Sequence, residues 1–221
     1  MANRITCRMG LSTAFGHVSA RIPDSDSFLI PGRSSPGLAE PGRLLTMELD
    51  GTVVAGEGPP NTEFWIHARI YAARPEVGAI VHVHSPACVV LSQLGLTVRP
   101  LHNSGAAVGI TVPVYEEVGL IRSRHLGDRV AAILGERPAM LLRGHGANTV
   151  AAEVHRATVL ACFLEEAAEL QLRALSAAGA GGQEIRYFTE QEVNLVGGQL
   201  QEQGPVERAW EYYSALVAGA V

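Results

Sequence analysis

The stretch PNTEFWIHARIYAARPEVGAIVHVHSP, residues 60–86, contains the boundaries of three successive elements of secondary structure. Asn61 or Thr62 can cap a helix that continues up to Pro75, where the helix must end. Residues 78–84 predict a buried strand, and the serine–proline pair that follows is typical of a helix start. Helix, strand and helix in close succession indicate an α/β domain.

The same alternation continues on both sides of this stretch. Further strands are predicted at 28–30, 47–49, 52–54, 111–115 and 139–142, and helices at 85–95, 127–134 and 152–178. Two more helical segments follow, separated by a glycine–proline pair. Because no repeat or long linker divides the chain, residues 1–221 are expected to form one domain.

The composition excludes several classes of protein. With 47% hydrophobic and 18% charged residues, the chain can bury a core and is not mainly disordered. A net charge of -5 gives no reason to expect nucleic acid as a partner. All 17 basic residues are arginines. Without lysine, Schiff-base aldolases, pyridoxal-phosphate enzymes and P-loop nucleotide-binding proteins are excluded.

The cysteines and the apolar runs bear on location. Cys7, Cys88 and Cys162 are odd in number and widely spaced, which argues against a disulfide framework or a cysteine-rich zinc site. No secretory signal opens the chain, and no apolar run reaches the roughly 20 residues of a membrane span. We therefore expect a cytoplasmic protein without a membrane partner.

Three histidines suggest a metal site. His82 and His84 are two apart on a predicted strand, so that both imidazoles project from one face. His145 lies between two glycines directly after another strand, where a tight turn can expose its ring. Together they match the three protein ligands of a catalytic metal site, which keeps one position open. The alternative is a set of hydrogen-bonded core histidines.

Glu63 is the best candidate for an acid or base, because it opens the helix that precedes the two-histidine strand. The alternative is a simple capping carboxylate. Three other histidines, at positions 67, 125 and 155, are interpreted as structural or surface residues.

These motifs resemble the class II aldolase and adducin family. The resemblance lies in residues 60–67, 70–77 and 79–85, in GHVSAR at 16–21 and in LLRGHG at 141–146, and it covers nearly the whole chain in the family's order. It implies a three-layer α/β/α fold around a central mixed, largely antiparallel sheet. It also implies a homotetramer with active sites between subunits.

For the site, the resemblance implies one divalent metal ion per subunit, held by His82, His84 and His145, with Glu63 as acid or base. Zinc, manganese, iron and cobalt all accept imidazole ligands, and the sequence does not choose among them. In the aldolase branch the metal holds substrate oxygens and stabilises the negative charge that forms as a carbon–carbon bond breaks.

Two departures weaken a sugar-phosphate aldolase assignment. The phosphate-binding positions of those aldolases correspond here to His17, Asn61 and Thr62, and the position of their proton-donating tyrosine to His102-Asn103. The Arg33-Ser34-Ser35-Pro36 stretch and the RGHG form resemble the branch of metal-dependent decarboxylases that act on hydroxylated aromatic or pyridine dicarboxylates. Arginine suits a carboxylate because it can donate two parallel hydrogen bonds. The expected substrate-binding residues are therefore His17, Arg33, Ser34, Asn61, Thr62 and Asn103.

The predicted function is that of a metal-dependent carbon–carbon lyase that decarboxylates a hydroxylated aromatic or heteroaromatic dicarboxylate, a small molecule. One alternative is a class II aldolase acting on a small unphosphorylated hydroxy-carbonyl compound. An alternative of another kind is a non-catalytic interaction module like the head of adducin, which would not need three metal ligands and Glu63.

Overall fold

A computed structural model describes residues 1–201 and 204–219, and its centre is an eight-stranded sheet. The strands are β1 (His17–Arg21), β2 (Ser27–Pro31), β3 (Leu44–Glu48), β4 (Val53–Ala55), β5 (Ala79–Val83), β6 (Val114–Tyr115), β7 (Ala139–Leu142) and β8 (Gly146–Ala151). Their order across the sheet is β4-β3-β2-β1-β5-β8-β7-β6. All neighbours are antiparallel except β6 and β7, which are parallel.

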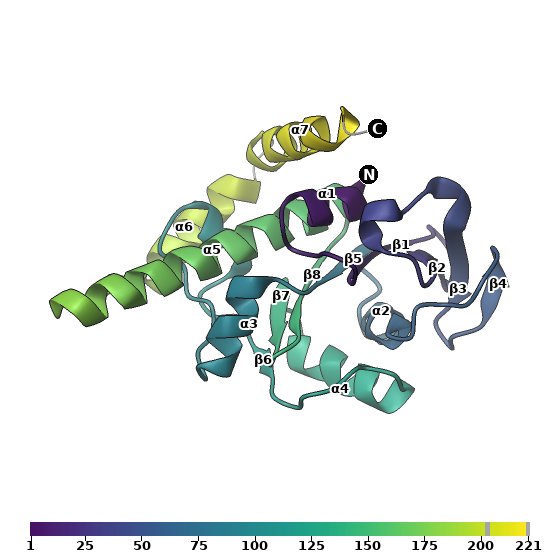
Figure 1. The fold of residues 1–221 in the computed structure, drawn as a ribbon, viewed down its shortest axis with the longest axis horizontal. Coiled ribbons are helices and arrows are strands. Elements are labelled where there is room, and N and C mark those ends of the chain that lie inside the picture. Colours follow the sequence, from purple (N-terminus) through teal and green to yellow (C-terminus); the bar gives the residue numbers. More distant parts are fainter. Residues whose placement is uncertain (202–203, 220–221) are drawn as a thin grey trace.

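Helices cover both faces of the sheet (Figure 1). The helices are α1 (Ala2–Arg8), α2 (Phe64–Ala73), α3 (Pro86–Gln93), α4 (Arg124–Leu134), α5 (Val154–Gly181), α6 (Glu190–Gln201) and α7 (Pro205–Ala218). Helices α2 and α4 pack on one face, and α1, α3, α5 and α7 contribute to the core on the other. The three-layer α/β/α fold with a mixed, largely antiparallel sheet is confirmed.

Alternate side chains of β5 point to opposite faces of the sheet and enter different parts of the core. Ala79, Val81 and Val83 point into the core beneath α5, whereas Ile80 points into the core beneath α2. His82 shares the α2 face with Ile80, because the two are two residues apart. The candidate site therefore lies on the side of the sheet that α2 and α4 cover.

Three elements are absent from the sequence-based prediction: β1, β8 and the short helix α1. Strand β1 carries the buried polar residues His17 and Ser19, and β8 carries buried Asn148 and Thr149, so neither shows the apolar pattern that predicts a strand. Both segments adopt a strand conformation because they pair with β5, β1 along one edge and β8 along the other. Strand β6 is also shorter than the predicted range 111–115.

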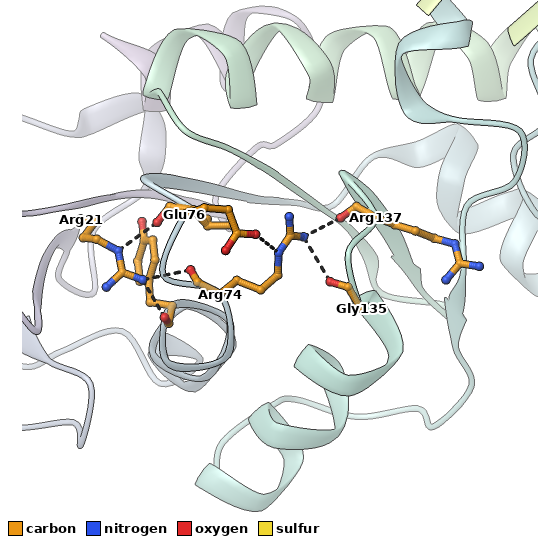
Figure 2. A network of polar contacts seen from close by, with 7 residues as sticks. Arg21, Arg74, Glu76, Gly135 and Arg137 are labelled. Atoms are coloured by element: carbon orange, nitrogen blue, oxygen red, sulfur yellow. Dashed lines mark hydrogen bonds and ion pairs between the residues drawn. The ribbon is translucent and has the colours of Figure 1, made fainter. Parts of the chain in front are cut away.

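Two arginines connect the C-terminal ends of α2 and α4 to the rest of the fold (Figure 2). Arg21 donates to the backbone oxygens of Tyr71, at 2.6 Å, and Val77, at 2.9 Å. Arg74 donates to the backbone oxygens of Gly135, at 3.2 Å, and Arg137, at 2.8 Å. Carbonyl groups at helix ends lack partners within the helix, so these bonds hold α2 and α4 in place relative to the sheet.

A buried carboxylate binds the free backbone N–H groups at the start of α3. Glu165 of α5 is 6% exposed and accepts hydrogen bonds from the backbone N–H groups of Ala87, at 2.8 Å, and Cys88, at 3.3 Å.

Among the helices in the described part of the chain, none combines the length and the apolar character that crossing a membrane requires.

Candidate metal centre and active-site cavity

The imidazoles of His82 and His84 lie side by side at the end of β5. Their ring centroids are 5.2 Å apart, with the ring planes nearly perpendicular at 76°. His82 is fully buried, and its Nδ1–H donates to the Oδ1 atom of Asn148 on β8, at 2.8 Å. The Oδ1 atom carries no hydrogen, so this bond places the His82 proton on Nδ1 and leaves a lone pair on Nε2.

His145 reaches the same point from the turn between β7 and β8. Its ring centroid lies 4.9 Å from that of His82 and 4.8 Å from that of His84. Gly146 makes this approach possible, since a Cβ atom at that position would lie 2.0 Å from the backbone oxygen of Val83. Glycine as the first residue of β8 therefore allows the turn to pack directly against the end of β5.

Glu63 completes the group from the N-terminal end of α2. One carboxylate oxygen accepts a hydrogen bond from the Ile121 N–H, at 2.8 Å, and the other lies 3.5 Å from Nε2 of His145. Asn61 Oδ1 accepts a hydrogen bond from the backbone N–H of Glu63, at 2.8 Å, which holds the start of the helix. Burial would raise the pKa of this carboxyl, but His145, His82 and the Ile121 N–H together lower it from 4.5 to about 2.

These four residues, named here the His–Glu cluster, fit a divalent cation. Their ligand atoms all lie within 4.8 Å of one another. Nε2 of His82 and both ring nitrogens of His145 are buried and have no hydrogen-bond partner in the described part of the chain. Burial, with the neighbouring His145, lowers the pKa values of His82 and His84, which favours the neutral form that binds metals. Buried lone pairs without partners are the expected state of ligands that await a cation.

A cavity of about 650 Å³ opens beside the His–Glu cluster. Most of the residues expected from the sequence to bind substrate line it together with Glu63 and His84, namely His17, Arg33, Ser34, Asn61 and Thr62. Asn103 is the exception. It lies at the exposed start of the short helix Ser104–Val108, which packs against α5 and α6, and it is not among the cavity-lining residues of the described chain. The stretch from Val98 to Val112 contributes to the core on the α5 side of the sheet, and the chain reaches the cavity only farther on, at Leu120 and Arg122.

Two arginines face the cavity without a carboxylate partner. The Nε–H of Arg33 donates to the backbone oxygen of Pro60, at 3.1 Å, which holds the side chain at the cavity and leaves the outer nitrogens of the guanidinium group available. Arg122, which the sequence analysis missed, lines the same cavity from the loop before α4. Neither forms an ion pair with any carboxylate in the described ranges. Glu63 is the one acidic residue among those lining the cavity.

Other residues of the site also escaped prediction. Phe15, which is 69% exposed, stacks on His84 with a centroid separation of 6.0 Å, and Leu120 lies on the cavity wall. His67 was interpreted as a structural or surface residue, and it is fully buried against His17, in agreement with a structural residue and not with a surface one. Phe15 and Leu120 belong to no motif found in the sequence, so only the folded chain brings them to the cavity.

Comparisons with known proteins agree with this geometry. Residues 1–172 match the Class II Aldolase and Adducin N-terminal domain. Over its whole length, the chain is 31% identical to a 3,4-dihydroxyphthalate decarboxylase of Arthrobacter keyseri, covering 92% of that protein. It is 35% identical to a 3,4-dihydroxyphthalate decarboxylase of Terrabacter over 81% of the chain and 80% of the relative. The solved structure of an aldolase II superfamily protein from Pseudomonas syringae superposes with a TM-score of 0.82 at 26% identity, over 99% of this chain and 90% of that one.

Proposed function

The chain belongs to the class II aldolase and adducin family and is a metal-dependent carbon–carbon lyase, and we propose that it decarboxylates a hydroxylated aromatic dicarboxylate. The observation that carries the proposal is the pairing, in one cavity, of the His–Glu cluster with the free guanidinium groups of Arg33 and Arg122. Two cationic groups that pair with no carboxylate in the described part of the chain match a substrate that bears two carboxylates. The related dihydroxyphthalate decarboxylases support the same substrate class.

In this proposal His82, His84 and His145 hold one divalent cation. When bound, the cation would withdraw electron density from substrate oxygens next to the bond that breaks. Arg33 and Arg122 bind the carboxylates, and Ser34, Asn61 and Thr62 offer further hydrogen bonds along the cavity wall. Of the expected substrate contacts, Asn103 is not proposed for the cavity of its own chain.

Glu63 is proposed to assist protonation of the ring carbon from which carbon dioxide leaves. As the carbon–carbon bond breaks, carbon dioxide leaves and the electron pair remains on the ring carbon, which must then be protonated. With its pKa near 2, Glu63 is ionised at neutral pH. It can therefore accept a hydrogen bond from a water molecule and position that water to give a proton to the ring carbon; the hydroxide that remains combines with the released carbon dioxide to form bicarbonate.

The direct test is the release of carbon dioxide from 3,4-dihydroxyphthalate and related hydroxylated dicarboxylates by protein of measured metal content. We expect about one divalent ion per chain, and turnover that falls at least 100-fold in Glu63→Gln with the metal retained. Aldehyde formation from hydroxy-carbonyl compounds without carbon dioxide release would establish the aldolase alternative. A folded, metal-free and inactive protein would favour the interaction module.

The roles of the arginines can be tested separately. Arg33→Ala and Arg122→Ala should each raise KM about tenfold or more, because each removes a charge-assisted hydrogen bond to the substrate. Arg43→Ala is a matched control, since this exposed arginine pairs with Glu40 outside the cavity. If neither cavity variant changed KM or kcat, the dicarboxylate assignment would lose its structural basis.

We also propose, from the family resemblance, that the protein forms a homotetramer. The proposal is consistent with exposed apolar side chains at the cavity, among them Phe15 and Leu120, which are 69% and 43% exposed. Sedimentation equilibrium measures the assembly directly, and a monomer at all concentrations would contradict it.

A further inference from the structure

A continuous chain of buried hydrogen bonds runs from the cavity along the interface between β1 and α2. Nδ1 of His17 lies 2.6 Å from Nε2 of His67, whose Nδ1 lies 2.6 Å from Oγ of Ser19. Oγ of Ser19 lies in turn 2.8 Å from the hydroxyl of Tyr71. His67 and Tyr71 are fully buried, and His17 and Ser19 are 3% and 2% exposed. His67, Ser19 and Tyr71 have no part in the catalysis proposed for this site.

The number of protons in this chain determines the direction of each hydrogen bond. His17 and His67 are buried, their facing ring nitrogens are 2.6 Å apart, and neither forms an ion pair with a carboxylate in the described part of the chain, so each imidazole is neutral and carries one N–H. The one side-chain partner of the Tyr71 hydroxyl in the described structure is Ser19. A buried hydroxyl proton without an acceptor is costly, so Tyr71 donates to Ser19.

The remaining directions follow in sequence. Ser19 accepts from Tyr71 and therefore donates its own proton to Nδ1 of His67. With Nδ1 as the acceptor, the proton of His67 is on Nε2, from which it is donated to Nδ1 of His17. His17 must then carry its proton on Nε2, the ring nitrogen left for the cavity that this residue lines.

This tautomer separates His17 from the metal ligands. The rings of His17 and His82 are close, with centroids 4.8 Å apart, yet a protonated Nε2 has no lone pair with which to bind a cation. It can instead donate a hydrogen bond to an anionic oxygen in the cavity.

We propose that His17 donates its Nε2–H to a carboxylate oxygen of the substrate, and that His67, Ser19 and Tyr71 are positioning residues that fix this tautomer. The substrate part rests on the proposed function, whereas the tautomer part follows from the hydrogen-bond chain alone. The two parts can therefore fail separately.

Nitrogen NMR of the metal-loaded protein, labelled with ¹⁵N-histidine, tests the tautomer directly. Assignments come from His17→Phe and His67→Gln. In the wild type we expect both His17 and His67 to be protonated on Nε2 and not on Nδ1. A His17 ring protonated on Nδ1, or on both nitrogens at neutral pH, would overturn the proposal whatever the substrate is.

A matched pair of substitutions tests the positioning role. His67→Gln keeps an N–H donor toward Nδ1 of His17, whereas His67→Glu offers only an acceptor when ionised and should draw the His17 proton to Nδ1. Calorimetric titration with phthalate, an unreactive dicarboxylate, measures the consequence. We expect binding within about threefold of wild type in His67→Gln and at least tenfold weaker in His67→Glu and His17→Phe. Thermal unfolding and metal content identify any variant that has lost its fold.

Equal phthalate affinity in folded His17→Phe and wild type would overturn the donor role, even with the expected tautomer. If His67→Glu does not fold, the wild-type spectrum and His17→Phe still decide. Failure of the proposed function would look different, since no dicarboxylate would then release carbon dioxide while the His17 tautomer remained as expected.

Discussion

Replacing Gly146 with alanine tests whether close backbone contact between β8 and β5 holds the metal ligands together. The added Cβ would lie 2.0 Å from the backbone oxygen of Val83 and 2.9 Å from Cα of His84, and real Cβ contacts essentially never fall below 3.0 Å. The neighbouring atoms are backbone and cannot turn aside as a flexible side chain could. The two strands must therefore separate by about 1 Å at this point.

The separation has a cost in stability and a larger consequence for metal binding. Overpacking of this kind lowers the free energy of unfolding by about 3 kcal/mol, which corresponds to a fall in Tm of roughly 6–12 °C for a chain of this size. The same shift moves His84 relative to His145, and metal sites tolerate ligand displacements of only about 0.2 Å. We expect the affinity for a divalent cation to fall at least tenfold.

Urea unfolding of the metal-free protein measures the first effect, and spectroscopic titration with cobalt measures the second. Gly179→Ala is the matched control. This glycine lies in α5 with no atom within 4 Å of the added Cβ, and alanine there should stabilise the helix by up to about 1 kcal/mol. Wild-type stability and cobalt affinity in Gly146→Ala would refute the view that this contact aligns the ligands.

Three further predictions concern buried polar groups. Asn148→Ala removes the acceptor that orients His82, so cobalt affinity should fall about 10- to 100-fold, and the buried N–H left without an acceptor should lower the free energy of unfolding by about 1–3 kcal/mol; unchanged affinity would contradict the orienting role. Glu63 has a lowered pKa in the folded protein, so its contribution to stability is present above about pH 4.5 and is lost as the pH falls toward 2. Urea unfolding of the metal-free proteins measures this effect. Between pH 5 and 3 the free energy of unfolding should fall more steeply for wild type than for Glu63→Gln. If the free energies of the two proteins fell in parallel with pH, the folded state would not stabilise the ionised carboxylate. Glu165→Ala leaves two N–H groups at the start of α3 without acceptors and should cost about 1–3 kcal/mol, with a smaller loss in Glu165→Gln; equal losses would exclude the capping role.

The elements that could be predicted from the sequence are those whose own residues carry the signal. Residues 61–86 contain a helix-ending proline and an apolar strand, and the structure has α2, β5 and α3 there, although Glu63 and not Asn61 or Thr62 is the N-cap residue of α2. Strands β1 and β8 carry buried polar residues instead, and their strand conformation depends on pairing with β5. The backbone pairing of a strand with polar inner residues depends on distant parts of the chain, so local pattern could not predict it.

The same distinction applies to the candidate site. The spacing of His82 and His84 and the glycines around His145 are local features, and these three residues do converge with Glu63. Arg122 has no local feature that sets it apart from the other arginines, and only the loop before α4 brings it to the cavity. Asn103 was placed in the site by resemblance, and it stays a prediction, because its segment packs against α5 and α6 and does not line the cavity of its own chain.

The contrast between His17 and His82 shows why residue type alone could not assign roles inside the site. Both imidazoles are buried and neutral, and their ring centroids are 4.8 Å apart. His82 faces an amide oxygen that can only accept, which leaves Nε2 bare and suited to a cation. His17 faces a neighbour that must donate, which leaves Nε2 protonated and suited to an anion. The partner on the far side of each ring therefore decides which charge the ring can bind, and those partners, Asn148 and His67, come from different elements of the fold.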